Sequence, residues 1–288
     1  MGDDYTRRKL FYFIIITAVL INCCLLNCNN TYKEIPKNIL IIHYIDVGQG
    51  DSELIQFNNK NILIDSGPKD SRKHLKHYLE SLGIKHFDYV IATHPHEDHI
   101  GNMDYIINNY KVNKFLSPKS IANTPSFISM INSLKNKKLK INVLYNGYDK
   151  INIDNKITVQ VLSPEKVKYD NINNYSAVIK LTYGKTSFLF TGDSEKQIED
   201  NLLQKNCNIK ADVLKVAHHG SSTSTSENYL KKVNPRIAII SVGLNNTYKH
   251  PSTKIINMLN KFNIKTFRTD KNGTIILQSD GNTIKKVL

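Results

Sequence analysis

Residues 93–102 read THPHEDHIGN, and three histidines and two carboxylates fall within six of these positions. The run directly follows an apolar stretch that is typical of a buried strand. In an extended loop His94 and His96 point to the same side, so both can bind one divalent ion. Asp98 and His99 lie one turn further on, beside the expected start of a helix, and can address a second ion. Imidazole and carboxylate ligands suit Zn²⁺, Mn²⁺ or Fe²⁺, so this stretch predicts a metal site.

The rest of the chain alternates apolar strands with helical stretches. Strands are expected at 39–45, 53–57, 61–67, 87–93, 114–116, 156–162, 177–190, 211–217, 236–242, 265–269 and 274–278, and helices at 70–82, 102–110, 124–138, 194–205, 225–232 and 252–262. No Pro-, Gly- or Ser-rich linker divides residues 39–288, which predicts one domain. The strings NILIDSG (61–67) and SFLFTGDS (187–194) both end an apolar strand in a carboxylate beside Gly and Ser. This echo predicts two similar β-rich halves.

Histidines and carboxylates also collect after other expected strands. His218 and His219 directly follow one apolar strand, His250 follows the next, and Asp193 stands at the end of SFLFTGD. Loops that leave strand ends at one edge of a sheet converge in space and can build a site on a rigid base. We therefore expect these residues to join the 93–102 cluster.

The net charge of the chain favours anionic partners. Its 39 Lys and Arg residues outnumber its 25 Asp and Glu residues, which gives +14. Nucleic acid or another phosphodiester polyanion is the partner class that such a charge attracts. The alternative is that scattered lysines only solvate the surface of a chain rich in Lys, Asn and Ile, and charge alone does not separate the two.

Residues 1–28 are predicted to be a signal peptide or a membrane anchor. The basic RRK at 7–9 precedes a nearly unbroken apolar run over 10–26, which is the pattern of an export signal. We therefore expect an exported protein, either anchored at the cell surface through the membrane or a lipid, or secreted. A short linker over 29–38 would lead into the folded domain. Beyond it only Cys207 remains, which excludes a disulfide framework and a thiolate metal site.

The sequence resembles the metallo-β-lactamase superfamily, whose signature HxHxDH is matched by His94, His96, Asp98 and His99. Within that superfamily it resembles the hydrolase domain of the DNA-uptake competence protein ComEC and its free-standing relatives. The matching strings, in the family's order, are DVGQGDS (46–52), ILIDSG (62–67), THPHEDHIGN (93–102), NNYSAVIKL (173–181), FLFTGDS (188–194), LKVAHHGSSTS (214–224) and YKHP (248–251). The resemblance implies an α/β fold, an αββα sandwich with metal ions at one edge.

The resemblance also implies a ligand set for two divalent ions, Zn²⁺ or Mn²⁺, with a single-ion site as the alternative. Its members would be His94, His96, Asp98, His99, Asp193 and His219. The first two would bind metal 1, the next two metal 2, and Asp193 would bridge both. His219 is favoured over His218 as the remaining ligand of metal 2, which leaves His218 to face the substrate.

Metal 1 departs from the pattern of many family members, which have another histidine between the first motif and the bridging aspartate. No histidine lies between His99 and His218 in this chain. The corresponding stretch offers Asn173, Asn174 and Ser176, so an amide oxygen or a hydroxyl, together with water, would complete metal 1. Such a site would be weaker and harder in character, which favours Mn²⁺ beside Zn²⁺.

Four further residues would support the site. Asp65 would orient a ligand histidine. Asp51, in the glycine-rich turn DVGQGDS, would buttress the metal edge. His250 would contact the substrate, and Lys249 would help to neutralise charge in the transition state.

These features predict an exported metal-dependent phosphodiesterase, a nuclease that acts on DNA. Asp98 and Asp193 would position the attacking hydroxide, and His218 or His250 would donate a proton to the leaving oxygen. One alternative keeps this chemistry but changes the substrate to a small phosphoester, a phosphorylcholine-bearing wall polymer or a lactone-type ring. The other alternative is a non-catalytic module that binds a polyanion. The sequence does not specify an oligomeric state.

Overall fold

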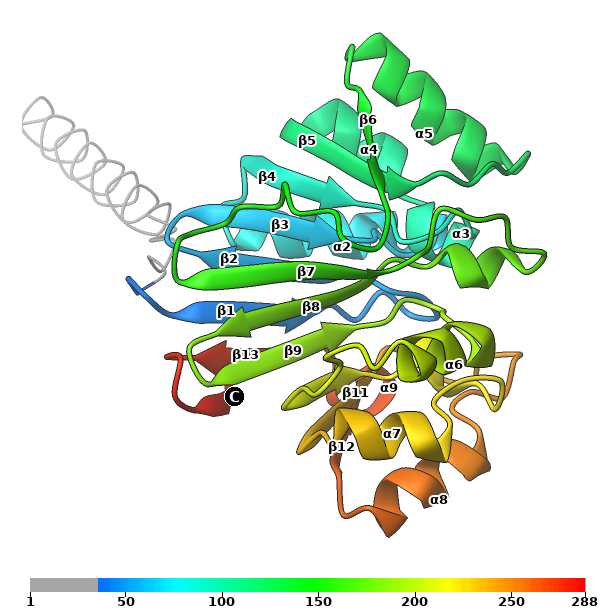
Figure 1. Ribbon diagram of the computed structural model, residues 1–288. Coiled ribbons are helices and arrows are strands. Elements are labelled where there is room, and N and C mark those ends of the chain that lie inside the picture. Colours follow the sequence, from blue (N-terminus) through cyan, green and yellow to red (C-terminus); the bar gives the residue numbers. More distant parts are fainter. Residues whose placement is uncertain (1–35, 288) are drawn as a thin grey trace, which may run out of the picture. The chain divides into compact units, whose positions relative to one another are not determined.

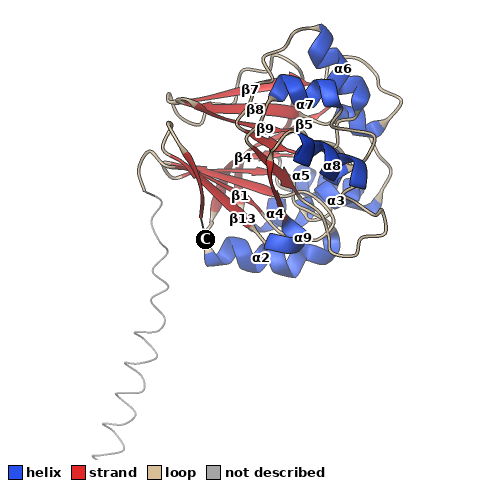
Figure 2. Cartoon of the chain, turned by 90° about the horizontal axis from the view of Figure 1, so that it is seen from below, coloured by secondary structure: helices blue, strands red, loops and turns tan. Residues whose placement is uncertain are grey.

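Two β-sheets pack face to face, with helices on their outer faces, in the computed structural model, which describes residues 36–287 (Figure 1). Figure 2 shows the two sheets as separate red layers with the blue helices outside them. The signal or anchor expected at 1–28 and most of the linker expected at 29–38 lie outside the described residues. Among the helices of residues 36–287, none is both long enough and apolar enough to cross a bilayer.

The larger sheet mixes antiparallel and parallel pairing. Its strands, in spatial order, are β14 (Ile284–Val287), β13 (Ile275–Ser279), β1 (Leu40–Tyr44), β2 (Glu53–Phe57), β3 (Lys60–Ile64), β4 (His86–Ile91), β5 (Lys111–Pro118) and β6 (Ile141–Leu144). Strands β3 to β6 run parallel because helices connect them. Consequently β3 and β4 end at the same edge of the sheet.

The smaller sheet is arranged in a similar way. Its strands, in spatial order, are β12 (Lys265–Arg268), β11 (Ile237–Ile240), β10 (Val213–Lys215), β9 (Thr186–Phe190), β8 (Val178–Tyr183) and β7 (Ile157–Ser163). Strands β9 to β12 run parallel, whereas β7, β8 and β9 form an antiparallel meander. In both sheets, therefore, a run of parallel strands follows an antiparallel hairpin, as the echo between the two halves of the sequence predicted.

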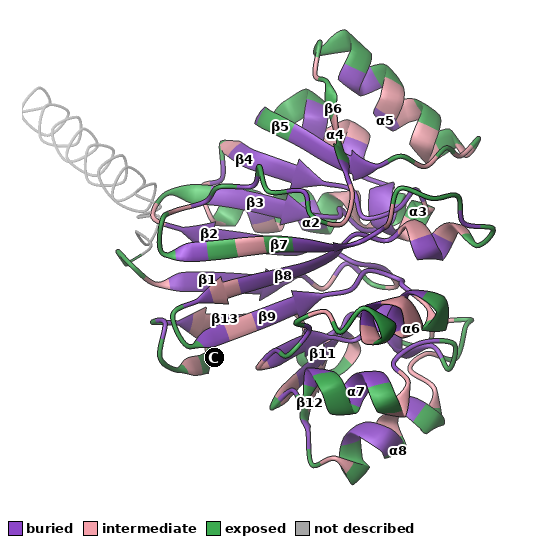
Figure 3. Ribbon diagram, in the orientation of Figure 1, coloured by how far each residue is buried: buried purple, intermediate pink, exposed green. Residues whose placement is uncertain are grey.

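Helices cover the outer face of each sheet. Those on the larger sheet are α2 (Arg72–Ser81), α4 (Met103–Asn109) and α5 (Pro125–Asn136), and those on the smaller sheet are α6 (Lys196–Gln204), α7 (Glu227–Val233) and α8 (Thr253–Lys261). Short helical turns are η1 (Lys69–Ser71), α3 (Glu97–Ile100), η2 (Ile172–Tyr175), η3 (Ala217–Gly220) and α9 (Thr269–Asn272). Figure 3 shows the exposed residues of α5, α7 and α8 alternating with buried ones, as expected for amphipathic helices.

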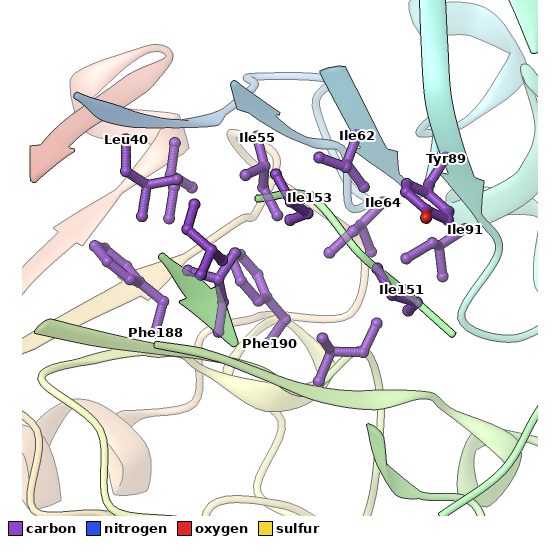
Figure 4. Packing of buried hydrophobic residues seen from close by; sticks show 14 of the residues in the cluster. Leu40, Ile55, Ile62, Ile64, Tyr89, Ile91, Ile151, Ile153, Phe188 and Phe190 are labelled. Carbon is purple, nitrogen blue, oxygen red and sulfur yellow. The ribbon is translucent and has the colours of Figure 1, made fainter. Parts of the chain in front are cut away.

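The central core fills the space between the sheets. Ile62 and Ile64 from the larger sheet face a space that Phe188 and Phe190 from the smaller sheet fill from the other side (Figure 4). Leu189, between the two phenylalanines, packs instead with the outer helices. This alternation follows from the two-residue period of a strand. The α/β class and the layered architecture are therefore as the sequence predicted.

Two strands were absent from the sequence expectation, β6 and β14. Both lie at an edge of the larger sheet. Their residues are mostly exposed or half-buried, and β14 contains two lysines. Because few of their side chains are buried, β6 and β14 lack the apolar run from which a central strand is predicted.

Replacing Phe188 with Ala is expected to lower the free energy of unfolding by about 3–5 kcal/mol, because the ring is fully buried between the sheets. Urea unfolding followed by circular dichroism measures this change. Val167→Ala, at a position that is 58% exposed, is the control and should stay within about 0.5 kcal/mol of the wild type. Equal losses in the two variants would contradict the packing.

Candidate metal centre

Loops that follow parallel strands converge at one edge of the sandwich. In the larger sheet Asp65 follows β3 and the 93–102 cluster follows β4, while in the smaller sheet Asp193 follows β9 and His219 follows β10. Parallel neighbours end at the same edge of their sheet. The loops from the two sheets come together: His219 Nε2 lies 3.2 Å from Asp98 Oδ2.

Asp98, His99, Asp193 and His219 form the first coordinating group. One donor atom from each lies within 4.8 Å of the other three. The shortest contacts join His219 Nε2 to Asp98 Oδ2 at 3.2 Å and His99 Nε2 to Asp193 Oδ1 at 3.3 Å. His99, Asp193 and His219 are buried, whereas the Asp98 side chain is partly exposed. His219, and not His218, is therefore the second-cluster histidine that joins this group.

His94, His96 and Asp193 form the second coordinating group. His94 Nε2 lies 3.0 Å from His96 Nδ1 and 3.9 Å from Asp193 Oδ2. Asp193 thus turns Oδ1 toward the first group and Oδ2 toward the second. A carboxylate shared in this way has the arrangement of a ligand that bridges two metal ions.

Hydrogen bonds decide which nitrogens of the first group are free. His219 Nδ1 lies 2.9 Å from the carbonyl oxygen of Ser241, and His99 Nδ1 lies 2.7 Å from Asp65 Oδ2. Carbonyl and carboxylate oxygens only accept hydrogen bonds, so each Nδ1 carries the proton. Each Nε2 is then the nitrogen that can bind a cation, once the cation displaces any second proton, such as the one shared by His219 Nε2 and Asp98 Oδ2 at 3.2 Å.

Thr93 gives His94 the same tautomer. Thr93 Oγ1 donates its hydrogen to Asp65 Oδ2 at 2.6 Å, so it can only accept from His94 Nδ1, which is 3.2 Å away. Ser176 Oγ lies 3.3 Å from the same nitrogen and accepts a hydrogen bond from the Asp193 backbone N–H at 3.1 Å. His94 Nε2 is therefore also free, and Asp65 and Ser176 act by orienting the coordinating residues.

Two buried atoms of the first group support the presence of a cation. Within residues 36–287, His99 Nε2 and Asp193 Oδ1 are both buried without a hydrogen-bond partner, although they lie 3.3 Å apart. When the ring is neutral, both atoms carry lone pairs, and two facing acceptors repel each other unless a proton or a cation lies between them. The imidazole and carboxylate donors of the two groups thus fit a pair of divalent ions.

Protons compete with a cation for the first group. Burial lowers the pKa of His219, but the Asp193 and Asp51 carboxylates outweigh burial and raise this pKa to about 10. Burial likewise raises the pKa of Asp193, but His219 and His99 outweigh it and hold that pKa well below its usual range. A cation must displace the imidazole protons, so its affinity rises with pH.

A buried ion pair joins the DVGQGDS turn to β10. Lys215 Nζ lies 2.8 Å from Asp51 Oδ2, and both side chains are almost fully buried. Asp51 Oδ1 lies 3.3 Å from His219 Nδ1. Burial raises the pKa of the Asp51 carboxyl, but Lys215 and His219 outweigh burial and lower this pKa overall. Asp51 therefore stays ionised beside a residue of the first group.

The same turn rests on the backbone of the 93–102 loop. The Asp51 N–H donates to the carbonyl oxygen of Asp98 at 3.1 Å. A Cβ atom at Gly50, where φ is +152°, would lie 2.3 Å from that oxygen. Only glycine allows this close approach. The turn therefore supports the metal edge.

An open pocket of about 560 Å³ gives access to both coordinating groups. The groups contribute His96, Asp98, Asp193 and His219 to its wall, and the sequence-predicted substrate residues His218 and His250 line it as well. His218 Nε2 lies 3.7 Å from Asp193 Oδ2, and its Nδ1 lies 3.4 Å from Glu195 Oε1. His218 is thus placed beside the bridging carboxylate and also faces the pocket.

The backbone separates His218 from His219. Both residues adopt the left-handed conformation, with φ of 49° and 53°, which is uncommon for residues other than glycine. Residues held in such conformations cluster at functional sites. The turn sends His219 into the first group and His218 to the pocket wall.

Two predicted residues lie apart from the coordinating groups. The side chain of Asn174 donates to Gln197 Oε1 at 2.8 Å and accepts from the Glu195 backbone N–H at 3.2 Å. Lys249 is exposed and does not line the pocket. Asn174 therefore fixes the loop that carries Glu195, and neither residue contacts a ligand histidine.

Four contributors were missed in the sequence: Thr93, Glu195, Lys215 and Ser241. Lys215 carried the clearest signal, because a lysine within the apolar run ADVLKVA must be buried with a counter-charge. Thr93 opens the cluster itself. Glu195 and the Ser241 carbonyl carried no local signal, since each acts on a histidine more than twenty positions away.

The chain is similar to a known family and to curated proteins. The sequence profile of the Metallo-beta-lactamase superfamily matches residues 45–243. The ComE operon protein 3 of Bacillus subtilis (strain 168) is 35% identical over 252 residues, which cover 81% of this chain and 32% of that protein. The competence protein ComA of Neisseria gonorrhoeae is 28% identical over 245 residues, which cover 84% of this chain and 33% of that protein. The chain thus spans about a third of the length of these curated relatives.

A solved structure shows the same fold. The metallo-beta-lactamase fold protein YhfI from Bacillus subtilis superposes with a TM-score of 0.56 at 13% sequence identity, covering 83% of this chain and 99% of that chain. At this identity the likeness concerns the fold alone. The fold agrees with the profile match over residues 45–243. The chain belongs to the metallo-β-lactamase superfamily.

Proposed function

We propose that this protein is an exported metal-dependent phosphodiesterase that cleaves DNA. The observation that carries the proposal is the sharing of Asp193 between two coordinating groups at the wall of an open pocket. Two metal ions side by side are suited to in-line displacement at phosphorus. The net charge of +14 and the similarity to a protein named a competence protein support a nucleic-acid substrate.

Two divalent ions, when bound, would act as Lewis acids on the phosphoryl oxygens and would lower the pKa of water. His94, His96 and Asp193 would hold one ion, and Asp98, His99, Asp193 and His219 the other. The Asp98 side chain, 28% exposed, is the carboxylate of the first group that is most open to the pocket. Asp98 is therefore placed to orient the attacking water and to accept its proton.

His218 would carry the proton that the leaving oxygen needs. Its Nδ1 lies 3.4 Å from Glu195 Oε1 and 3.3 Å from Thr223 Oγ1, so that the ring is held from one side. Its Nε2 points toward Asp193 Oδ2 at 3.7 Å. His250, whose ring centroid is 5.7 Å from that of His218, is the second candidate for this role.

Metal content should separate the two neighbouring histidines. We expect wild-type protein to bind two ions per chain, and His219→Ala to bind about one or to lose at least about tenfold in affinity for the second. His218→Ala should retain both ions, because His218 belongs to neither group. Metal analysis after dialysis against Mn²⁺ or Zn²⁺ measures this. Equal losses in the two variants, or one ion in the wild type, would contradict the ligand assignment.

Digestion of single-stranded and duplex DNA with added Mn²⁺ or Zn²⁺ tests the activity. Asp98→Ala should lower the rate at least about 100-fold, because it removes a ligand and the residue that orients water. Asp149→Ala, at an exposed position outside both groups, is the matched control and should keep the wild-type rate.

Other outcomes of the same assay would overturn the proposal. Equal digestion by the wild type and Asp98→Ala would exclude the metal mechanism. Faster hydrolysis of a chromogenic phosphorylcholine ester, small phosphoester or lactone than of DNA would assign another substrate. Binding of DNA by metal-loaded wild type without cleavage would identify a non-catalytic binding module.

Export rests on the sequence of residues 1–28. Fractionation of cells that make the full chain should place the protein outside the cytoplasm, either in the membrane fraction or in the medium. A chain that starts at residue 29 should stay in the cytoplasm, because it lacks the basic and apolar segments of the signal. The same cytoplasmic location for both chains would contradict export.

A further inference from the structure

A row of rings leads from the first coordinating group to the protein surface. The ring centroids of His219 and His218 are 6.2 Å apart, those of His218 and His250 are 5.7 Å apart, and those of His250 and Tyr248 are 5.8 Å apart. All four residues line the 560 Å³ pocket. Exposure rises along the row, from the buried His219 to Tyr248, which is 67% exposed. The row therefore connects the reaction site with solvent.

Tyr248 and His250 form a stacked aromatic pair at the outer end of this row. Their rings are nearly parallel, with an angle of 20° between the planes. A single exposed aromatic ring is common on protein surfaces, but Tyr248 also lines the pocket, where aromatic side chains often contact a ligand. Tyr248 has no part in either coordinating group, so its position is not explained by metal binding.

The loop that carries these rings is held in place. The Asn246 side-chain amide donates to the carbonyl oxygens of Gly243 and His250 at 3.0 and 2.7 Å, and its oxygen accepts from the His250 backbone N–H at 2.9 Å. The Gly243 N–H donates to Gln49 Oε1, in the DVGQGDS turn, at 3.1 Å. A surface that is already ordered loses little conformational entropy when a ligand binds.

We propose that Tyr248 and His250 form a binding subsite for one unpaired nucleobase of the strand whose phosphodiester lies at the coordinating groups. This inference rests on the proposed function and makes its substrate more specific. Aromatic side chains stack on any base, because every base has a π-face. Bases in a duplex are already stacked on each other, so the subsite favours single-stranded DNA and tolerates any sequence.

A quaternary ammonium group is the competing ligand for an exposed tyrosine, since cations also bind aromatic faces. Asp70 and Glu97 line the same pocket and would favour a cation. However, a cation site of this kind surrounds its ligand with several rings, whereas Tyr248 and His250 are stacked with their centroids 5.8 Å apart and leave no room for a ligand between them. The exposed ring of Tyr248, at the outer end of the stacked pair, matches the flat face of a nucleobase, so we favour a base over a cation.

The test compares two substrates of equal length and charge, oligodeoxyadenylate and an oligomer with tetrahydrofuran in place of every nucleoside. Values of kcat/KM are measured for the full, metal-loaded chain as wild type, Tyr248→Ala, Tyr248→Phe and Leu244→Ala. The wild type should prefer the base-bearing oligomer. Tyr248→Ala should reduce that preference about 5- to 150-fold, the range expected for loss of one stacked base.

The control variants isolate stacking. Tyr248→Phe keeps the ring and should keep the preference, which shows that the hydroxyl is not responsible. Leu244→Ala removes an exposed side chain, 72% accessible, on the same loop but outside the pocket. It should leave the preference unchanged.

Three results would overturn the inference. The first is equal cleavage of both oligomers by the wild type, which would leave the proposed phosphodiesterase standing without the base subsite. The second is an equal slowing of both oligomers by Tyr248→Ala. The third is a Tyr248→Ala defect confined to a phosphorylcholine ester, which would assign a cation site. If the wild type cleaves neither oligomer, the proposed function fails and the base subsite fails with it.

Discussion

Asp193 is the constraint on which the arrangement of the site depends. Its side chain is only 2% exposed, and within the described residues its Oδ1 has no hydrogen-bond partner. An ionised carboxylate in such a place is unfavourable unless positive charge surrounds it. Histidines from two separate loops, His94 and His99 on one side and His219 on the other, lie within 3.3 to 3.9 Å of its oxygens. Both loops are therefore arranged so that their histidines surround the Asp193 carboxylate.

The sandwich supplies these loops from different sheets. The 93–102 loop and Asp65 follow strands of the larger sheet, whereas Asp193 and His219 follow strands of the smaller sheet. Bound cations would cross-link the two sheets at the edge where the central core ends. Ligands that bind only the folded state stabilise it, so cation binding and sheet packing would support each other. The Asp51–Lys215 pair joins the same two sheets within the protein.

The sequence allowed most of the residues that the structure brings together at this edge to be predicted, but not the contacts between them. His94 to His99 could be interpreted because their spacing lies within one loop, and His218 and His219 because they follow an apolar strand. Thr93 and Ser241 escaped notice, since their roles depend on which nitrogen of a distant ring they contact. The edge strands β6 and β14 escaped for a related reason: their patterns reflect a solvent-exposed edge and not the core.

The second coordinating group has fewer ligand residues than the first, three instead of four. Ser176 Oγ accepts from the Asp193 N–H and contacts His94 Nδ1, and Asn174 is engaged by Gln197 and Glu195. Two of the three candidates for the missing third ligand thus already hold other parts of the site, whereas Asn173 Oδ1 is buried without a hydrogen-bond partner among the described residues. An ion held by His94, His96 and Asp193 alone would keep at least one position open, as catalytic sites do. In the proposed phosphodiesterase a phosphoryl oxygen of the substrate would then complete the site, so the substrate would help to bind the weaker ion.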